Sequence, residues 1–287
     1  MKDDQMPPGR RALLRGAAAL GLAAATGCVG AEPAGTPGRA AATGAAASGP
    51  PAAGPGAFRA RRPSAYRLRP MAGHAPARTA PAGLAVRRAP ILRLPGRTRA
   101  MVLTFDDGPD PRYTPDILRT LRQYDTRAMF FVCGEMVAHN QDLLRQMADD
   151  GHVIGNHTWS HPLLPDLTRS AVREQLERTS EIVQGTVGVP PLWFRAPYGA
   201  WNRAVFELGA ELGMEPLAWT VDTLDWRTPG TRTIVRRVLN GAGPGVVVLS
   251  HDAGGDRTQS VRALDRYLPE LLASGFHLTV PPRPPGW

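Results

Sequence analysis

The 287-residue sequence has only two cysteines, Cys28 and Cys133, which excludes a disulfide-stabilised scaffold. It also lacks any apolar run of about 20 residues, the length needed to span a bilayer, so no permanent membrane helix is expected. Acidic residues are scarce at the start of the chain. Residues 1–100 contain 3 Asp and Glu against 16 Lys and Arg, whereas residues 101–287 contain 22 against 18. The positive net charge therefore belongs to the first hundred residues and does not indicate a nucleic-acid-binding domain.

The N-terminal residues 1–28 are typical of a bacterial export signal. A twin arginine at Arg10 and Arg11 precedes a short apolar run over residues 16–25, and small residues lead to Cys28. This pattern resembles a twin-arginine signal that ends in a lipobox, in which Cys28 is lipidated. The alternative is ordinary signal cleavage near Ala25, with Cys28 incidental. Either way, we expect an extracytoplasmic protein, secreted or held at the membrane by a lipid anchor only.

Residues 29–96 are predicted to form a disordered linker rich in Ala, Pro, Gly and Arg. Residues 29–90 contain 20 Ala, 10 Pro, 9 Gly and a single acidic residue, Glu32, without a hydrophobic period. Such a segment cannot bury enough apolar surface to offset the loss of chain entropy on folding. Its nine arginines would suit a polyanion, but a solvated spacer is an equally good interpretation.

Residues 97–287 are predicted to form one α/β domain, because short apolar runs alternate with amphipathic stretches. The expected fold is a distorted (β/α) barrel of about seven strands. The predicted strands are 100–105, 128–132, 153–156, 193–195, 216–221, 246–250 and 277–280. The predicted helices are 115–123, 140–150, 168–187, 202–212, 231–239 and 259–274.

Polar side chains gather at the ends of these predicted strands. Because the carboxyl ends of barrel strands share one face, and that face carries the chemistry, the pattern predicts a catalytic site. The residues at these ends are Asp106, Asp107, His157, Arg195, Asp222 and His251.

The residue types indicate metal-assisted hydrolysis. His157 and His161, four residues apart, can turn both imidazoles toward one cation. One of the two neighbouring aspartates can complete three ligands and leave an open coordination position, while the other takes a proton from water. His251 is the best candidate for the proton donor. A buried Arg195 would need a carboxylate partner, with Asp106, Asp222 and Asp225 as the choices.

Five motifs then appear in order: TFDDGP at 104–109, HTWSHP at 157–162, RAPY at 195–198, DTLDW at 222–226 and LSH at 249–251. Together they resemble the motifs of the polysaccharide deacetylase family (carbohydrate esterase family 4, the NodB homology domain), over about residues 98–280. The resemblance implies a divalent metal, usually Zn²⁺, with Co²⁺, Ni²⁺ or Mn²⁺ as alternatives. It assigns the metal ligands to Asp107, His157 and His161.

The resemblance also implies roles for the remaining site residues. Asp106 would be the general base, oriented by Arg195, and His251 the general acid, supported by Asp222 with Asp225 as the reserve. The backbone N–H of Tyr198 would help to hold the oxyanion, and Trp226 and Leu249 would wall the pocket for the acetyl methyl group. Trp159 and Trp201 could stack on sugar rings or pack in the core.

The expected reaction is removal of N-acetyl groups from a cell-wall polysaccharide, with peptidoglycan (N-acetylglucosamine or N-acetylmuramic acid residues) as the first choice of substrate. A chitooligosaccharide deacetylase and an acetylxylan esterase are the alternatives of the same chemistry. A catalytically silent wall-binding lipoprotein is the alternative of another class. We expect a monomer with a polysaccharide partner and no nucleic acid.

Lipidation at Cys28 is directly testable. We predict that the wild-type chain incorporates palmitate when produced in a bacterial host, and that Cys28→Ser does not. Palmitate labelling of both proteins gives the answer. Equal labelling of the two would remove Cys28 as the lipidated residue, and labelling of neither would favour plain secretion.

Overall fold

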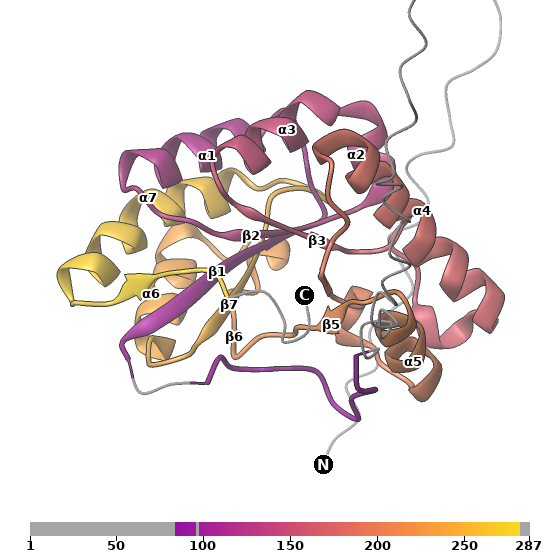
Figure 1. The fold of residues 1–287 in the computed structure, drawn as a ribbon. Helices are drawn as coiled ribbons and strands as arrows, with labels where there is room; N and C mark the ends of the chain where they lie inside the picture. Colours follow the sequence, from indigo (N-terminus) through magenta and orange to yellow (C-terminus); the bar gives the residue numbers. More distant parts are fainter. Residues whose placement is uncertain (1–83, 96–97, 282–287) are drawn as a thin grey trace, which may run out of the picture. The chain divides into compact units, whose positions relative to one another are not determined.

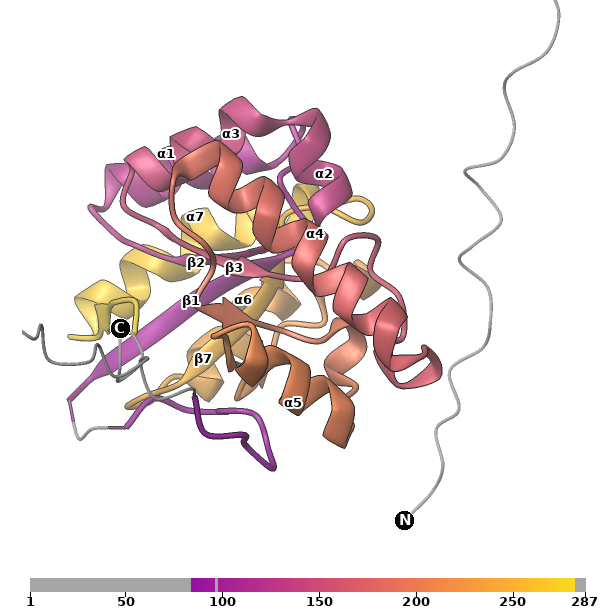
Figure 2. The same cartoon turned by 45° about the vertical axis from the view of Figure 1, so that its right-hand side comes forward.

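The computed structural model describes residues 84–95 and 98–281. The predicted signal peptide at 1–28, Cys28 and most of the predicted linker lie outside these residues. No helix in the described part of the chain is long and apolar enough to cross a membrane. Within it, the chain folds as an α/β domain built on a curled parallel sheet (Figures 1 and 2).

The sheet consists of short strands that pair in parallel. Seven of them follow the order β5-β4-β3-β2-β1-β7-β6, and β8 pairs with the first residues of β1. The strands are β1 (Ala100–Asp106), β2 (Met129–Val132), β3 (Val153–Asn156), β4 (Trp193–Phe194), β5 (Glu215–Pro216), β6 (Val221–Asp222), β7 (Val247–His251) and β8 (His277–Leu278). This confirms the predicted distorted barrel.

The helices lie around the curled sheet, and buried apolar side chains lie between the two (Figure 1). Thr168 caps the longest helix as predicted, because its hydroxyl oxygen accepts a hydrogen bond from the Ala171 amide. The helices are α1 (Thr114–Gln123), α2 (Gly134–His139), α3 (Gln141–Asp149), α4 (Arg169–Val187), α5 (Arg203–Glu211), α6 (Thr231–Gly241) and α7 (Thr258–Ala273).

Strand alternation decides which side chains reach the inside of the curl. Along β1, Met101, Leu103 and Phe105 join the large apolar cluster beneath the helices, whereas Val102 joins a different cluster with Leu217. The alternate face of β1 therefore carries Val102, Thr104 and Asp106 toward the interior. The polar side chains of the site therefore lie on the same face of the sheet as the apolar cluster that contains Val102 and Leu217.

Two predictions about the elements were wrong. The apolar run at 216–221 is not one strand: β5 and β6 lie at opposite edges of the sheet, and residues 217–220 cross between them. An apolar run has the same pattern whether it forms a buried strand or crosses an interior. The six-residue helix α2 was missed because it is too short to show a helical period.

The folded part also begins earlier than residue 97. Residues 84–95, which the sequence places in the linker, are held against the domain. Ile91 bridges Leu217, and Arg93 bridges Val246. Arg87 forms an ion pair with the buried Glu215. The linker prediction is therefore wrong for this segment.

Candidate active site

A buried ion pair stands at the interior end of β1. Asp106 is 2% exposed and Arg195, which directly follows β4, is 0% exposed. The guanidinium Nη1 of Arg195 donates to Oδ1 of Asp106 over 2.6 Å and to the hydroxyl of Thr104, one interior position below, over 2.8 Å. Asp106 is thus the carboxylate partner of Arg195 among the three that the sequence leaves open.

Arg195 is fixed by further acceptors. Its Nε donates to the carbonyl of Leu217 and its Nη2 to the carbonyl of Ala218, each over 3.0 Å. The guanidinium carbon lies 4.1 Å from the centre of the Phe131 ring, a cation–π contact from below. Every nitrogen of the guanidinium therefore has a partner, which a fully buried charge requires.

Burial raises the pKa of Asp106 to about 6, against the opposing effect of the positive charges on Arg195 and His251. A carboxyl group whose pKa lies close to neutral pH is both largely ionised at pH 7 and able to accept a proton. This is the property that a general base needs.

Three side chains next to Asp106 form a cluster that could hold a metal ion. One ligand atom from each of Asp107, His157 and His161 lies within 4.8 Å of the other two. Oδ1 of Asp107 is 3.5 Å from Nε2 of His157 and 3.4 Å from Nε2 of His161. Asp107 and His161 both have positive φ, at 79° and 57°, so the loops after β1 and β3 turn sharply to bring them together.

The hydrogen bonds of this cluster fit a cation. Nδ1 of His157 is 2.8 Å from the carbonyl of Arg195, so it carries the proton and leaves the lone pair of Nε2 facing Asp107. Burial lowers the pKa values of both histidines, so the rings are neutral. Oδ1 of Asp107 is buried and accepts no hydrogen bond from the described residues. Lone pairs that converge without a proton between them suit a bound divalent ion.

His251, at the end of β7, lies beside Asp106 in the sheet register and is held by Asp225. Its Nδ1 is 2.6 Å from Oδ1 of Asp225, and its backbone amide donates to Oδ2 of the same residue over 2.9 Å. Ser260 donates to that Oδ2 as well. Asp225 is therefore a rigid, 1% exposed partner that orients the imidazole.

The preference for Asp222 as the partner of His251 was wrong. Oδ1 of Asp222 accepts a hydrogen bond from the Leu224 amide over 2.7 Å, which closes a turn. Leu224 follows with a positive φ of 49°, and the short 3₁₀ turn Asp225–Arg227 starts directly after it. This reversal brings Asp225 beneath His251, whereas the Asp222 carboxylate is used by its own turn.

Asp225 sets the proton affinity of His251. Burial by itself would lower the pKa of the imidazole, but the Asp225 carboxylate, by its charge and its hydrogen bond, raises it to about 9. His251 is therefore protonated at neutral pH, with Nε2 left to donate. An acid and a base thus stand on neighbouring strands, which is the arrangement that proton transfer to a leaving group requires.

The predicted substrate contacts lie near this centre. Tyr198 is 55% exposed, has φ of 63° and sets its ring edge-on to His161, with the centroids 4.6 Å apart. Leu249 is buried next to Thr104 in the β1–β7 register, and Trp226 is half-buried under the guanidinium of Arg227. Their roles toward a substrate stay predictions.

Trp159 and Trp201 are packing residues. The ring of Trp159 lies under Arg178 and fills the space in front of Gly134, where a side-chain carbon would come within 2.3 Å of it. Trp201 stacks on Phe206, 5.2 Å between centroids. Their spacing in the sequence left sugar stacking open, and these contacts favour the core interpretation.

Sequence reasoning missed Asp252, which directly follows His251. It is fully buried, accepts hydrogen bonds from the Gly108 amide and the Thr114 hydroxyl, and has its pKa raised by burial to about 7. It thereby ties the loop after β1 to the end of β7. The sequence pair His251-Asp252 offered a signal for this residue, since it stands at the same strand end.

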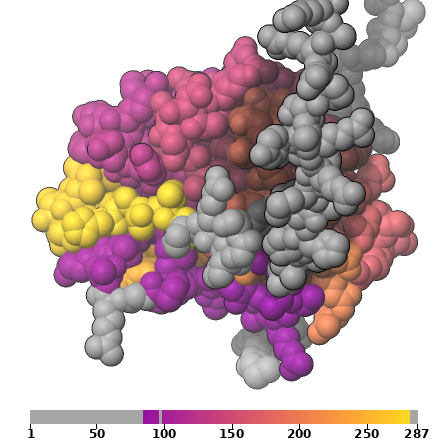
Figure 3. All heavy atoms as spheres, in the orientation of Figure 1, coloured from indigo at the N-terminus to yellow at the C-terminus, as the bar shows by residue number. Residues whose placement is uncertain are grey.

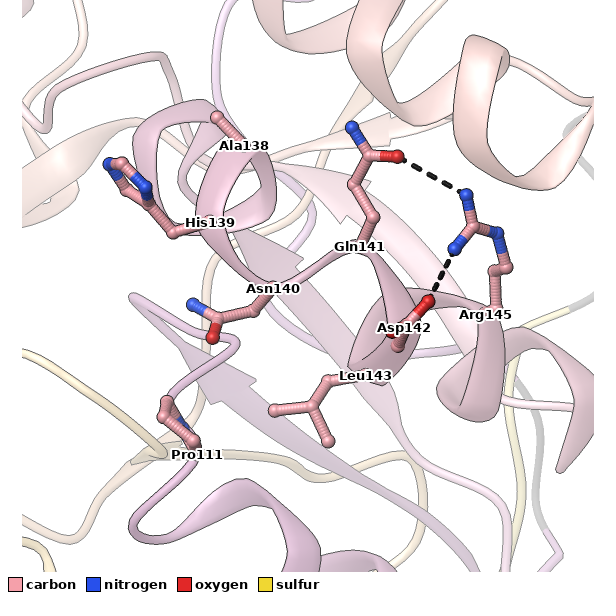
Figure 4. A pocket seen from close by; sticks show the side chains of 8 residues that line it. All are labelled: Pro111, Ala138, His139, Asn140, Gln141, Asp142, Leu143 and Arg145. Carbon is pink, nitrogen blue, oxygen red and sulfur yellow. Dashed lines mark hydrogen bonds and ion pairs between the residues drawn. The ribbon is translucent and has the colours of Figure 1, made fainter. Parts of the chain in front are cut away.

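A shallow surface pocket lies apart from this site. Figure 4 shows it at the junction of α2 and α3, where Arg145 bonds to both Gln141 and Asp142 and the ring of His139 lies on the rim. Its lining includes no residue predicted for the site. The side chain of His139 is exposed.

Comparisons with known proteins agree with this geometry. Residues 94–217 match the family described as polysaccharide deacetylase. The chain is 40% identical over 185 residues to a peptidoglycan-N-acetylglucosamine deacetylase of Bacillus cereus, covering 64% of this chain and 86% of that one. It is 38% identical to a chitooligosaccharide deacetylase of a Bradyrhizobium species, covering 63% and 88%.

A solved structure is similar as well. The crystal structure of a peptidoglycan N-acetylglucosamine deacetylase in complex with 4-naphthalen-1-yl-N-oxidanyl-benzamide has 37% sequence identity and a TM-score of 0.65, covering 67% of this chain and 90% of that one. The chain belongs to the polysaccharide deacetylase family. The predicted family and enzyme class are thereby confirmed.

For this polysaccharide deacetylase family member, metal binding can be measured directly. We predict that His157→Ala loses most bound zinc, because it removes one of the three predicted ligands and the ring that the Arg195 carbonyl orients. His139→Ala, on the surface outside the cluster, is the matched control and keeps the wild-type zinc content. Elemental analysis of the purified proteins measures both. Full zinc content in His157→Ala would remove His157 as a ligand.

Proposed function

We propose that this chain is a metal-dependent hydrolase that removes N-acetyl groups from peptidoglycan. The observation that carries the proposal is the adjacency of three groups: the Asp107–His157–His161 cluster, the buried carboxylate of Asp106 and the Asp225-bound imidazole of His251. Amide hydrolysis needs a general base for water and a general acid for the departing amine, and this site has a candidate for each.

Asp106 would act as the base. Arg195 occupies its Oδ1, so Oδ2 is the oxygen left to accept the proton of the attacking water. Oδ2 lies 3.6 Å from Nε2 of His157, which places it beside the ligand cluster. A water that gives its proton to Asp106 would therefore lie beside the ligand cluster.

His251 would act as the acid. Its Nδ1 faces Asp225, so the proton on Nε2 is the one that passes to the leaving nitrogen. Asp225 stabilises the protonated ring before the transfer and fixes its direction. The Tyr198 backbone amide would donate to the developing oxyanion, and Leu249 and Trp226 would enclose the acetyl methyl group.

A divalent ion held by Asp107, His157 and His161 would supply a Lewis acid beside Asp106. We propose zinc, because one carboxylate and two imidazoles are ligands that zinc accepts and three protein ligands leave a position open for water or substrate. Cobalt, nickel and manganese are the alternatives.

Peptidoglycan is the proposed substrate on two grounds. A relative of 40% identity carries that substrate in its name, and the N-terminus is predicted to export the chain to the side of the membrane where the wall lies. We accordingly propose an extracytoplasmic location, with Cys28 as the lipid anchor. The Bradyrhizobium relative makes chitooligosaccharides the second candidate.

The test is acetate release by the full chain reconstituted with zinc. We predict release from peptidoglycan, its loss after EDTA treatment, and its restoration by added zinc. Chitohexaose and acetylxylan are assayed in parallel. Release from chitohexaose alone would change the substrate, and no release from any polymer by a zinc-loaded protein would contradict the proposal.

The base assignment has its own prediction. Asp106→Asn keeps the shape and loses the proton acceptor, so we expect acetate release to fall by roughly 10²–10⁴-fold, the usual contribution of general acid–base catalysis. The variant should bind zinc as the wild type does, since its own side chain lies outside the predicted ligand set. Near-normal turnover would refute the assignment.

The acid assignment predicts a pH dependence. Because His251 works protonated and its pKa lies at about 9, the rate should fall as the pH rises through that value. Asp225→Asn removes the charge that raises this pKa, so its alkaline limb should move to lower pH. Asp222→Asn is the comparison variant: its carboxylate bonds to the Leu224 amide and not to His251, so the limb should move much less. The kcat–pH profiles of the three proteins measure this. An alkaline limb at the wild-type pH in Asp225→Asn would contradict the assignment of His251 as the acid.

A further inference from the structure

Residues 84–95, here called the strap, form a chain of contacts along the crossing segment 217–220. The Ile91 amide donates to the carbonyl of Pro216, and the Ala218 amide donates to the carbonyl of Ile91, each over 2.8 Å. The Thr220 hydroxyl donates to the carbonyl of Leu92 over 2.5 Å. The family match begins at residue 94, so most of the strap precedes it.

Both ends of the strap are anchored as well. At one end Arg87 pairs with both carboxylate oxygens of Glu215, which is buried at the start of β5. At the other end the Leu94 amide donates to the carbonyl of Gly245 over 2.8 Å, just before β7. Figure 1 shows this indigo segment running between the β5 side and the β7 side of the sheet, and Figure 3 shows its atoms against the orange atoms of the later chain.

The opposite side of the crossing segment holds Arg195. The carbonyls of Leu217 and Ala218 accept the hydrogen bonds from its Nε and Nη2. The backbone of Ala218 therefore faces both ways: its N–H is held by Ile91 of the strap, and its carbonyl holds the guanidinium. From Arg195 the next bond is the one to Asp106.

The crossing segment is held from two sides. The sheet bonds its first and last amides, Leu217 N–H to the Phe194 carbonyl over 3.0 Å and Thr220 N–H to the Val247 carbonyl over 2.9 Å, and the strap bonds the amide of Ala218 between them. β5 and β6 have two residues each, and they pair only with β4 and β7 respectively. Backbone amides at this depth need partners, and the strap supplies acceptors and donors where the ladder ends. The Ile91 side chain adds an apolar contact with the interior cluster that includes Leu217.

We propose that the strap is a positioning element for the reaction: it holds the crossing segment, whose two carbonyls orient Arg195, and through Arg195 it orients Asp106. The proposal rests on the proposed function of Asp106 as the base. Arg87 and Ile91 are positioning residues, since their hydrogen bonds go to residues 215–218 and not to the site itself. A shift of about 1 Å at a catalytic group can cost about 10²-fold in rate, so a loosened crossing segment has a measurable effect.

The proposal predicts a specific kinetic pattern. Arg87→Ala in the full chain should lower kcat about tenfold, while KM and bound zinc stay as in the wild type, because the metal ligands lie on the loops after β1 and β3. Arg87→Lys keeps one charge-assisted bond to Glu215 and should recover most of the rate. Arg88→Ala is the matched control and should behave as the wild type, since Arg88 is exposed and forms no hydrogen bond or ion pair with the described residues.

The decisive readouts are kcat and KM from acetate release, zinc content, and hydrogen exchange of the amides of residues 217–220. Faster exchange there in Arg87→Ala, with a lower kcat and unchanged KM, supports the proposal. Unchanged kcat and exchange would overturn it. A lower kcat that comes with a changed KM and a lower zinc content would also overturn it, because that pattern indicates general unfolding.

The exchange measurement separates this proposal from the proposed function. If the wild type released no acetate, the function would fail, but the strap's hold on residues 217–220 would still be measured by exchange. Thr220→Val, which removes the hydroxyl bond to the Leu92 carbonyl and the longer one from the Val247 amide, provides a second variant on the other side of the contact. It should raise exchange in the same segment, and protection equal to that of the wild type would count against the strap.

Discussion

The bond between Arg195 and Asp106 is the interaction on which the rest of the site depends. A fully buried guanidinium is stable only when its donors are satisfied and its charge is compensated, since removing one partner leaves an uncompensated charge. Here the fold meets that demand with one carboxylate, one hydroxyl and two carbonyls that come from β1 and from the crossing segment. The same burial raises the pKa of Asp106 into the range where a carboxylate works as a base.

His251 and Asp225 form a second buried pair, in which the candidate catalytic group is the cation and its partner is the carboxylate. His251 is a group that burial would discharge, and Asp225 keeps it protonated. The two proposed proton-transfer groups stand on adjacent strands in register, with partners of opposite charge, and their pKa values are about 6 and about 9. Between these values, at neutral pH, both groups are in the form that hydrolysis requires.

Much of the fold and of the candidate site can be predicted from the sequence. Short apolar runs predict β1 and β7, and the polar residues that follow them predict one catalytic face. The choice between Asp222 and Asp225 was not legible, because it depends on the left-handed turn at Leu224, a residue type that gives no signal for positive φ. The split of residues 216–221 between two sheet edges was equally hidden, since an apolar run does not reveal its pairing partners. Residues 84–95 lack a period and were assigned to the linker, yet their backbone groups supply the contacts that the short strands β5 and β6 leave open.

The strap and the crossing segment, which have little regular secondary structure, are thus linked to the buried guanidinium of Arg195 through hydrogen bonds. The strap and the crossing segment have few residues in strands, but their carbonyls and amides form a continuous path to the guanidinium in the interior. The proposed metal ligands, in contrast, follow the longer strand β1 and lie in the loop after β3, so the proposed metal site and the proposed base have separate supports.

The most direct test of this account is a double-mutant cycle between Asp106 and Arg195, measured as kcat for acetate release. If Arg195 acts through Asp106, Arg195→Lys lowers kcat in the wild-type background but has no further effect in Asp106→Asn, within about threefold. If the two losses multiply, Arg195 contributes to the reaction by a route that does not pass through Asp106, and the central claim is wrong.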